Sequence, residues 1–110
     1  MLQPLLNFAM WNIEGLTSVK CSDPQFLSYI SNFDILSFVE TWSNDHNVAA
    51  NLPGFQLVDS RNRQKHKKAR RNSGGIKVFV KNNIFKGVEK LSTPSSNPDI
   101  IWVKLDHNFF

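Results

Sequence analysis

The chain has 110 residues, of which 41% are hydrophobic, and a formal net charge of +4 at pH 7. That length allows one domain at most, and nine phenylalanines with three tryptophans exclude an intrinsically disordered chain. Cys21 is the only cysteine, which excludes an intrachain disulfide and thiolate metal sites and favours a reducing compartment.

The N-terminal part is predicted to start with a strand and a helix. Leu5–Trp11 is a nearly continuous apolar run, typical of a strand buried on both faces, and Gly15 interrupts it. Asp23 offers an N-cap and Pro24 occupies the first helical position. Apolar residues then recur at helical spacing over about three turns; they are Phe26, Leu27, Ile30 and Phe33.

A second buried strand is predicted at Ile35–Glu40. Strand, helix and strand within about forty residues form a βαβ unit with a right-handed crossover, which makes the two strands parallel. The carboxyl ends of both strands are therefore expected at the same edge of the sheet.

The remaining sequence predicts further strands with turns between them. The expected strands are Phe55–Asp59, Gly75–Lys81, Ile84–Leu91 and Ile100–Leu105. The first two are expected to pair like a hairpin, and the turn-rich segment STPSSNPD separates the last two. The chain therefore predicts an α/β fold with a mixed sheet in one domain.

Polar side chains follow the two parallel strands. Asn12 and Glu14 are two positions apart, which would place them on one face about 6.6–7 Å apart if the strand continued. Glu40 closes the neighbouring strand, and ligands of open α/β sheets gather beyond such carboxyl ends. Two carboxylates and an amide suit Mg²⁺ or Mn²⁺ and a phosphate substrate. The alternative is that both glutamates are solvated strand ends and Asn12 satisfies a turn.

Four segments, in this order along the chain, resemble a known family. WNIEGL, then FDILSFVETW, then GFQLVDSR and SGGIKVFV resemble the endonuclease/exonuclease/phosphatase superfamily, specifically the endonuclease domain of non-LTR (LINE-like) retrotransposons. The resemblance covers Leu5 to Leu105. It implies that residues 1–110 form the N-terminal half of a four-layer α/β sandwich.

The resemblance also implies roles for individual residues. Asn12 matches the asparagine that contacts the scissile phosphate, Glu14 matches an acidic position near the metal, and Glu40 matches the principal metal-ligand glutamate. Asn12 and Glu40 are thus the candidate catalytic residues, and Glu14 and Glu40 the candidate ligands of Mg²⁺ or Mn²⁺.

The segment at 61–73 is strongly basic. Seven of the 13 Lys and Arg residues of the chain fall within eleven of its positions. We expect contact with the DNA backbone, although an isolated charge run is more often a solvated loop. The candidate nucleic-acid-binding residues are Arg63, Lys65, Lys67, Lys68, Arg70 and Arg71. His66, within this segment, is expected to be a surface group.

Other candidate residues are given structural roles. Trp11 and Trp102 are expected in the core, and Trp42 is expected to pack even though it follows the Glu40-Thr41 pair. His46 has no evident partner. Asp106-His107 resembles the family's terminal Asp-His pair, but it directly follows a segment that matches a mid-domain strand, so no catalytic role is predicted for it.

The resembled family also uses a later half, with an Asp-x-Asn motif and a terminal Asp-His pair, that is not seen in this sequence. We therefore expect a fragment of a DNA-nicking enzyme, inactive alone, whose inner sheet face and Phe109-Phe110 are exposed. In a full-length element a reverse transcriptase would be covalently linked. The alternatives are another phosphodiesterase or phosphatase of the superfamily, or a non-catalytic nucleic-acid-binding remnant.

The expected location is intracellular, and nuclear for a functional element. No stretch approaches the roughly 18 apolar residues that a membrane span requires, and the N-terminus does not resemble a secretory signal. We therefore predict a soluble chain with no membrane partner.

Overall fold

The structure is a computed structural model that describes residues 5–42, 52–62, 74–92, 100–106 and 108–110. Its elements are β1 (Phe8–Asn12), α1 (Ser18–Ser22), α2 (Pro24–Ile30), β2 (Ile35–Val39), β3 (Phe55–Arg61), β4 (Ile76–Lys81), the 3₁₀ helix η1 (Asn82–Gly87), β5 (Val88–Leu91) and β6 (Trp102–Leu105). None of the helices within these ranges has the length and apolar character that crossing a bilayer demands.

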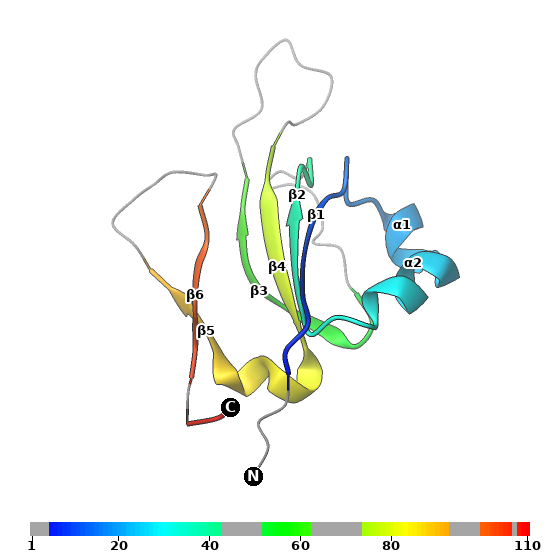
Figure 1. Cartoon of the computed structure of the whole chain (residues 1–110). Helices are drawn as coiled ribbons and strands as arrows, with labels where there is room; N and C mark the ends of the chain where they lie inside the picture. Colours follow the sequence, from blue (N-terminus) through cyan, green and yellow to red (C-terminus); the bar gives the residue numbers. More distant parts are fainter. Residues whose placement is uncertain (1–4, 43–51, 63–73, 93–99, 107) are drawn as a thin grey trace.

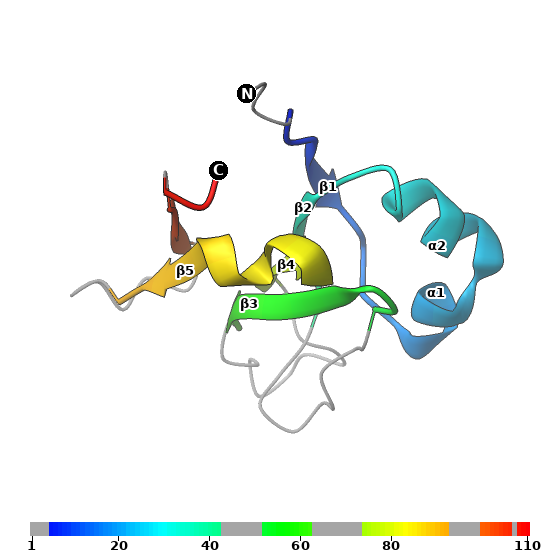
Figure 2. The same ribbon diagram turned by 90° about the horizontal axis from the view of Figure 1, so that it is seen from below.

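A mixed sheet of four strands forms the centre of the molecule. The strand order is β1-β2-β4-β3, with β1 parallel to β2 and the other two pairings antiparallel. Strands β5 and β6 pair separately as a second, antiparallel sheet. Helices α1 and α2 cover one face of the central sheet, and η1 with β5 and β6 lies on the other (Figures 1 and 2). The predicted α/β fold with a mixed sheet is confirmed.

The first strand differs from its prediction. It lies at the edge of the sheet, and its side chains alternate between exposed and half-buried. Ala9 and Trp11 pack on the helix side, whereas Phe8 and Met10, on the other face, are 56% and 71% exposed. A strand buried on both faces was therefore the wrong interpretation, because an unbroken apolar run does not distinguish a central strand from an edge strand.

The helical segments also differ in length. Helix α2 has seven residues, about two turns, and is capped by the Asp23 side chain with Pro24 in its first turn, as predicted. A short helix, α1, precedes it and is capped by Thr17. Where a strand was predicted from Ile84, the chain first forms η1, and only Val88–Leu91 is extended.

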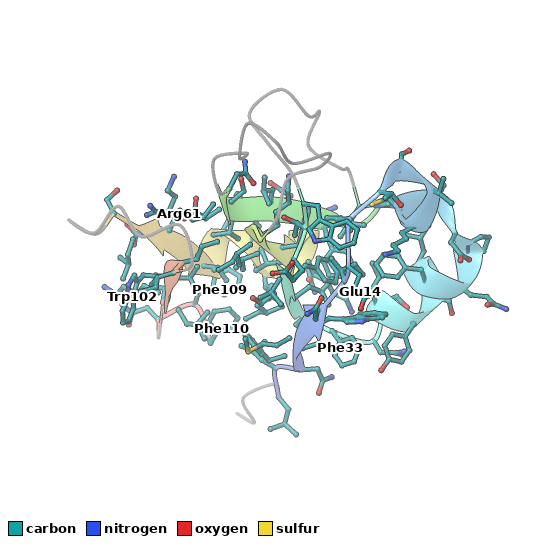
Figure 3. The ribbon with its side chains drawn as sticks, turned by 90° about the horizontal axis from the view of Figure 1, so that it is seen from above. Glu14, Phe33, Arg61, Trp102, Phe109 and Phe110 are labelled. Carbon is teal, nitrogen blue, oxygen red and sulfur yellow. The ribbon has the colours of Figure 1, made fainter. Side chains whose placement is uncertain are left out.

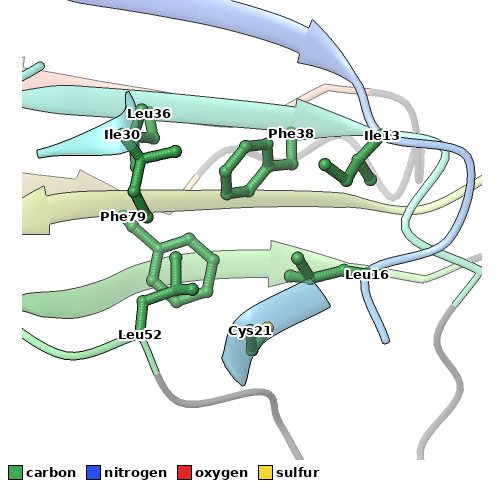
Figure 4. Packing of buried hydrophobic residues seen from close by; sticks show 8 residues of the cluster. All are labelled: Ile13, Leu16, Cys21, Ile30, Leu36, Phe38, Leu52 and Phe79. Atoms are coloured by element: carbon green, nitrogen blue, oxygen red, sulfur yellow. The ribbon is translucent and has the colours of Figure 1, made fainter. Parts of the chain in front are cut away.

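Two apolar cores lie on opposite faces of the central sheet. The core beneath the helices is built from Ile13, Leu16, Cys21, Ile30, Leu36, Phe38, Leu52 and Phe79 (Figure 4). The core facing η1 and β5 is built from Ile35, Val78, Val80, Ile84 and Val88. The central sheet is therefore covered by apolar packing on both faces, and its strand ends carry the candidate site residues.

Aromatic residues near the C-terminus are only partly buried. Trp102 is 53% exposed, so its predicted place in the core is wrong, whereas Trp11 packs against the first core. Phe109 is 45% exposed, as expected, while Phe110 packs against the second core.

Candidate functional site

Strands β1 and β2 bring the predicted site residues to one edge of the sheet. Asn12 is in register with Val39, the last residue of β2. Backbone hydrogen bonds continue beyond both strands, because the Gly15 N–H donates to the Glu40 carbonyl at 2.7 Å and the Leu16 N–H to the Thr41 carbonyl at 3.0 Å. The backbones that carry Asn12, Glu14 and Glu40 are thus side by side, as the βαβ prediction required.

The backbone leaves strand geometry at this edge. Glu14, Glu40 and Trp42 have φ angles of 49°, 57° and 57°, and they are the only non-glycine residues with positive φ in the described chain. Left-handed backbone is uncommon for such residues and concentrates where surrounding structure fixes it. Because β1 ends at Asn12, the expectation that Asn12 and Glu14 share one strand face does not hold.

The same turn changes where Glu40 points. Leu36 and Phe38 of β2 face the helices, so a continued strand would direct Glu40 to that side and Asn12 to the other. The left-handed backbone at Glu40 interrupts this alternation. The Glu40 carboxylate is instead held by the Trp42 indole, whose Nε1 donates to Oε2 at 3.0 Å.

Glycines allow the turns around Glu40 to pack closely. Gly15 has φ of 90°, and a Cβ there would lie 2.6 Å from the Trp42 ring. Gly75 has φ of 93°, and a Cβ there would lie 2.5 Å from Thr41 Oγ1. The Thr41 N–H donates a hydrogen bond to the Gly75 carbonyl at 3.3 Å, and the Trp42 N–H donates one to the Gly74 carbonyl at 2.9 Å. The EG and GG dipeptides therefore position the ETW segment between β1 and β4.

Lys20 of α1 stabilises the turn that carries Glu14. Its Nζ donates to three successive carbonyls, those of Ile13, Glu14 and Gly15, the last two at 3.1 and 2.9 Å. An ammonium has three donors, so this contact uses all of them. The helix thereby holds the backbone at the end of β1.

The donor atoms at this edge are suitable for a hard cation. Asn12 Oδ1 accepts a weak 3.3 Å hydrogen bond from the Glu14 N–H, so Asn12 in part stabilises the turn, as the alternative interpretation of the sequence expected. The Glu14 side chain is exposed. Glu40 Oε2 accepts from Trp42, and Oε1 has no hydrogen-bond partner among the described residues. Mg²⁺ takes one or two carboxylates and completes its shell with water and substrate oxygens, which fits this sparse set. Across the described ranges no three His, Cys, Asp or Glu side chains gather as a closed site.

A buried hydroxyl lies next to these donors. Thr41 is 2% exposed, and its Oγ1 has no hydrogen-bond partner among the described residues. A buried polar atom without a partner is uncommon in native proteins and marks positions where a water or ion can bind. The Thr41 hydroxyl is therefore a buried oxygen without a partner in the described part of the chain, one residue after Glu40 and beside Gly75.

Several predicted residues lie outside the described ranges. These are the basic residues Arg63, Lys65, Lys67, Lys68, Arg70 and Arg71, together with His46, His66 and His107. Conversely, sequence reasoning missed Lys20 and Gly75 as supports of the site. Lys20 carried no signal, because a lysine on a short helix is ordinary, whereas the paired glycines before β4 did indicate a close backbone approach.

No protein-family model matches this chain, and no curated protein matches it significantly.

Proposed function

We propose that this chain supplies the metal-binding part of a Mg²⁺- or Mn²⁺-dependent DNA endonuclease of the endonuclease/exonuclease/phosphatase superfamily, of the kind found in non-LTR retrotransposons. One observation carries the proposal. Parallel pairing of β1 with β2 brings the backbones of Asn12, Glu14 and Glu40, the three positions that match the family motifs, to one edge of the sheet.

In this proposal each side chain has a defined task. Glu40, oriented by Trp42, and Glu14 hold the cation, while the Asn12 amide contacts the phosphate to be cleaved. The bound cation supplies Lewis-acid stabilisation of the phosphoryl oxygens. The residue that activates the attacking water belongs to motifs of the family that this sequence does not contain.

The layer order supports the same proposal. Helices, a mixed sheet and a second antiparallel sheet follow one another, which is compatible with one half of a four-layer sandwich. Phe8 and Met10 leave an apolar patch on the inner side of β1 that a second half would cover. In a complete element the domain would act in the nucleus and be joined to a reverse transcriptase.

A Mn²⁺ titration monitored by electron paramagnetic resonance tests the proposal. We expect the wild-type protein to bind one Mn²⁺ ion. Glu40→Ala should reduce the Mn²⁺ affinity at least about 10-fold, the size of effect seen when groups that support a metal site are removed. Glu89→Ala is the matched control, because Glu89 is an exposed carboxylate on β5, a strand of the second sheet that pairs with neither β1 nor β2. Equal affinity in all three proteins would show the metal assignment to be wrong.

A further inference from the structure

A buried carboxylate on β3 lies between two cations from different sheets. The Asp59 side chain is 5% exposed, and its Oδ1 accepts the Ser60 N–H at 2.8 Å and lies 3.3 Å from Lys90 Nζ of β5. Arg61 Nε lies 4.0 Å from Oδ2, too far for a hydrogen bond, and Oδ2 has no other partner in the described chain. The carboxylate therefore holds both cations by charge and positions them side by side.

The two cations keep donors for a ligand. Asp59 approaches Arg61 from its Nε side, so the two terminal guanidinium nitrogens have no partner among the described residues. Lys90 is 52% exposed, and its ammonium, which has three N–H donors, forms an ion pair with Asp59 Oδ1 at 3.3 Å. Two positive charges against one negative charge leave a net positive site, and a guanidinium fork with free ends matches the oxygens of a phosphate.

Arg61 of this cluster lies on the same face of the central sheet as Asn12 and in the same cross-strand row. The register runs from Asn12 to Val39, then to Ile76, and then to Arg61. Strands β1, β2 and β3 run in one direction, so all three end at the edge seen in Figure 3, where Glu14 and Arg61 are labelled. Three strand spacings of about 4.8 Å separate the Asn12 and Arg61 backbones by roughly 14 Å.

We propose that Arg61 and Lys90, held by Asp59, bind a backbone phosphate of the nucleic acid whose cleaved phosphate lies at Asn12 and Glu40. The inference rests on the proposed function and adds a second contact to it. A spacing of roughly 14 Å corresponds to about two steps between phosphates along one strand, because each step combines an axial rise of about 3.4 Å with movement around the helix. The cluster thus sets where the substrate strand runs across the end of the sheet.

The salt dependence of DNA binding tests this site. Fluorescence anisotropy with a labelled DNA duplex, in EDTA so that metal binding makes no contribution, gives the slope of log affinity against log salt for each variant. Lys90→Ala is expected to reduce the slope by about one and the affinity several-fold, and Lys90→Arg to restore both. Lys104→Ala, an exposed lysine on the paired strand β6, is the matched control and should change less.

A second variant separates anchoring from net charge. Asp59→Asn adds one positive charge, so charge alone predicts tighter DNA binding, whereas loss of the anchor predicts weaker binding. We expect weaker binding, and tighter binding would overturn the role of Asp59. If Asp59→Asn does not fold, the Lys90 variants still test the phosphate site. Identical salt slopes of DNA binding for wild type and Lys90→Ala would overturn the site. That result would leave the Mn²⁺ titration at Glu40, and with it the proposed function, unaffected.

Discussion

The Trp42 indole donates a 3.0 Å hydrogen bond to the Glu40 carboxylate. Both residues have left-handed backbones and lie just beyond β2. Trp42 in turn packs its ring over Gly15, at the end of β1. The indole therefore connects the two strand ends and sets the direction of the proposed metal ligand. This relationship makes Trp42 a positioning residue.

Trp42→Phe should weaken divalent-ion binding while the fold remains intact. Phenylalanine keeps the apolar contact with Gly15 but removes the Nε1 donor, so Glu40 loses its orientation. Loss of such a partner typically reduces metal affinity about 10-fold or more. Mn²⁺ titration measures the effect, and Trp11→Phe serves as the control because Trp11 packs in the helix-side core. Unchanged Mn²⁺ affinity in Trp42→Phe would contradict the positioning role.

Lys20→Met should loosen the turn that carries Glu14. The substitution keeps the aliphatic length but removes the charge-assisted bonds to the carbonyls of residues 13–15. A hydrogen bond to a charged group contributes up to about 1.5–3 kcal/mol, and water can replace part of this for the freed carbonyls. We therefore expect the free energy of unfolding to fall by about 1–2 kcal/mol. Urea denaturation measures it. Lys86→Met, on the exposed side of η1, should change stability little.

Gly75→Ala should destabilise the protein more than Gly54→Ala does. Both glycines have left-handed backbones, with φ of 93° and 83°, so alanine strains either position by about 1–2 kcal/mol. At Gly75 the new Cβ would also meet Thr41 Oγ1, whereas nothing lies within 4 Å at Gly54. The difference between the two variants in thermal unfolding reports this contact. Equal losses of stability in the two variants would show that the turn at Thr41 can move away from the new Cβ without a measurable loss in the free energy of unfolding.

Local signals in the sequence were sufficient for the βαβ unit. The Asp23-Pro24 cap and the apolar runs predicted α2 and the parallel strands, because cap chemistry and periodicity act over a few residues. The edge position of β1 and the exposure of Trp102 could not be predicted, since they depend on which elements pack across the sheet. Sequence reasoning therefore located the strand ends but not their surroundings.

The detail of the candidate site was beyond sequence reasoning for a similar reason. Glutamate and tryptophan rarely adopt positive φ, so nothing in WNIEGL or VETW predicted the left-handed turns at Glu14, Glu40 and Trp42. Likewise, the Asp59 cluster depends on a bulge in β3 and on the approach of β5. Long-range pairing, rather than local preference, assembled both groups of residues.

Lys77→Met should stabilise the protein at neutral pH. Lys77 of β4 is 4% exposed, and burial lowers the pKa of its ammonium below the ordinary 10.5, against the opposing effect of Cys21. The folded state therefore binds this proton less tightly than the unfolded state. The charged side chain reduces stability at every pH below the lowered pKa, and this penalty disappears as the pH rises to about 10.5.

Urea denaturation at a series of pH values measures the effect. The stability advantage of Lys77→Met over wild type should be largest near pH 7 and should shrink toward alkaline pH. Lys104→Met, at an exposed position of β6, should show no such trend. If Lys77→Met is less stable than wild type at pH 7, the prediction is wrong, because the interactions of the charged Lys77 amine would then outweigh the cost of its burial.

The Cys21 thiol should react slowly with iodoacetamide in the folded protein. It is 8% exposed, and burial raises its pKa above the ordinary 9.0, while the nearby Lys77 charge lowers it in part. Because the thiolate is the reactive form, both shielding and the raised pKa slow the reaction relative to protein unfolded in urea. Removing the charge in Lys77→Met should raise the pKa of Cys21 further and slow alkylation again. Mass spectrometry of the alkylated fraction over time measures both rates, and equal rates in folded and unfolded protein would refute the buried position of Cys21 on α1.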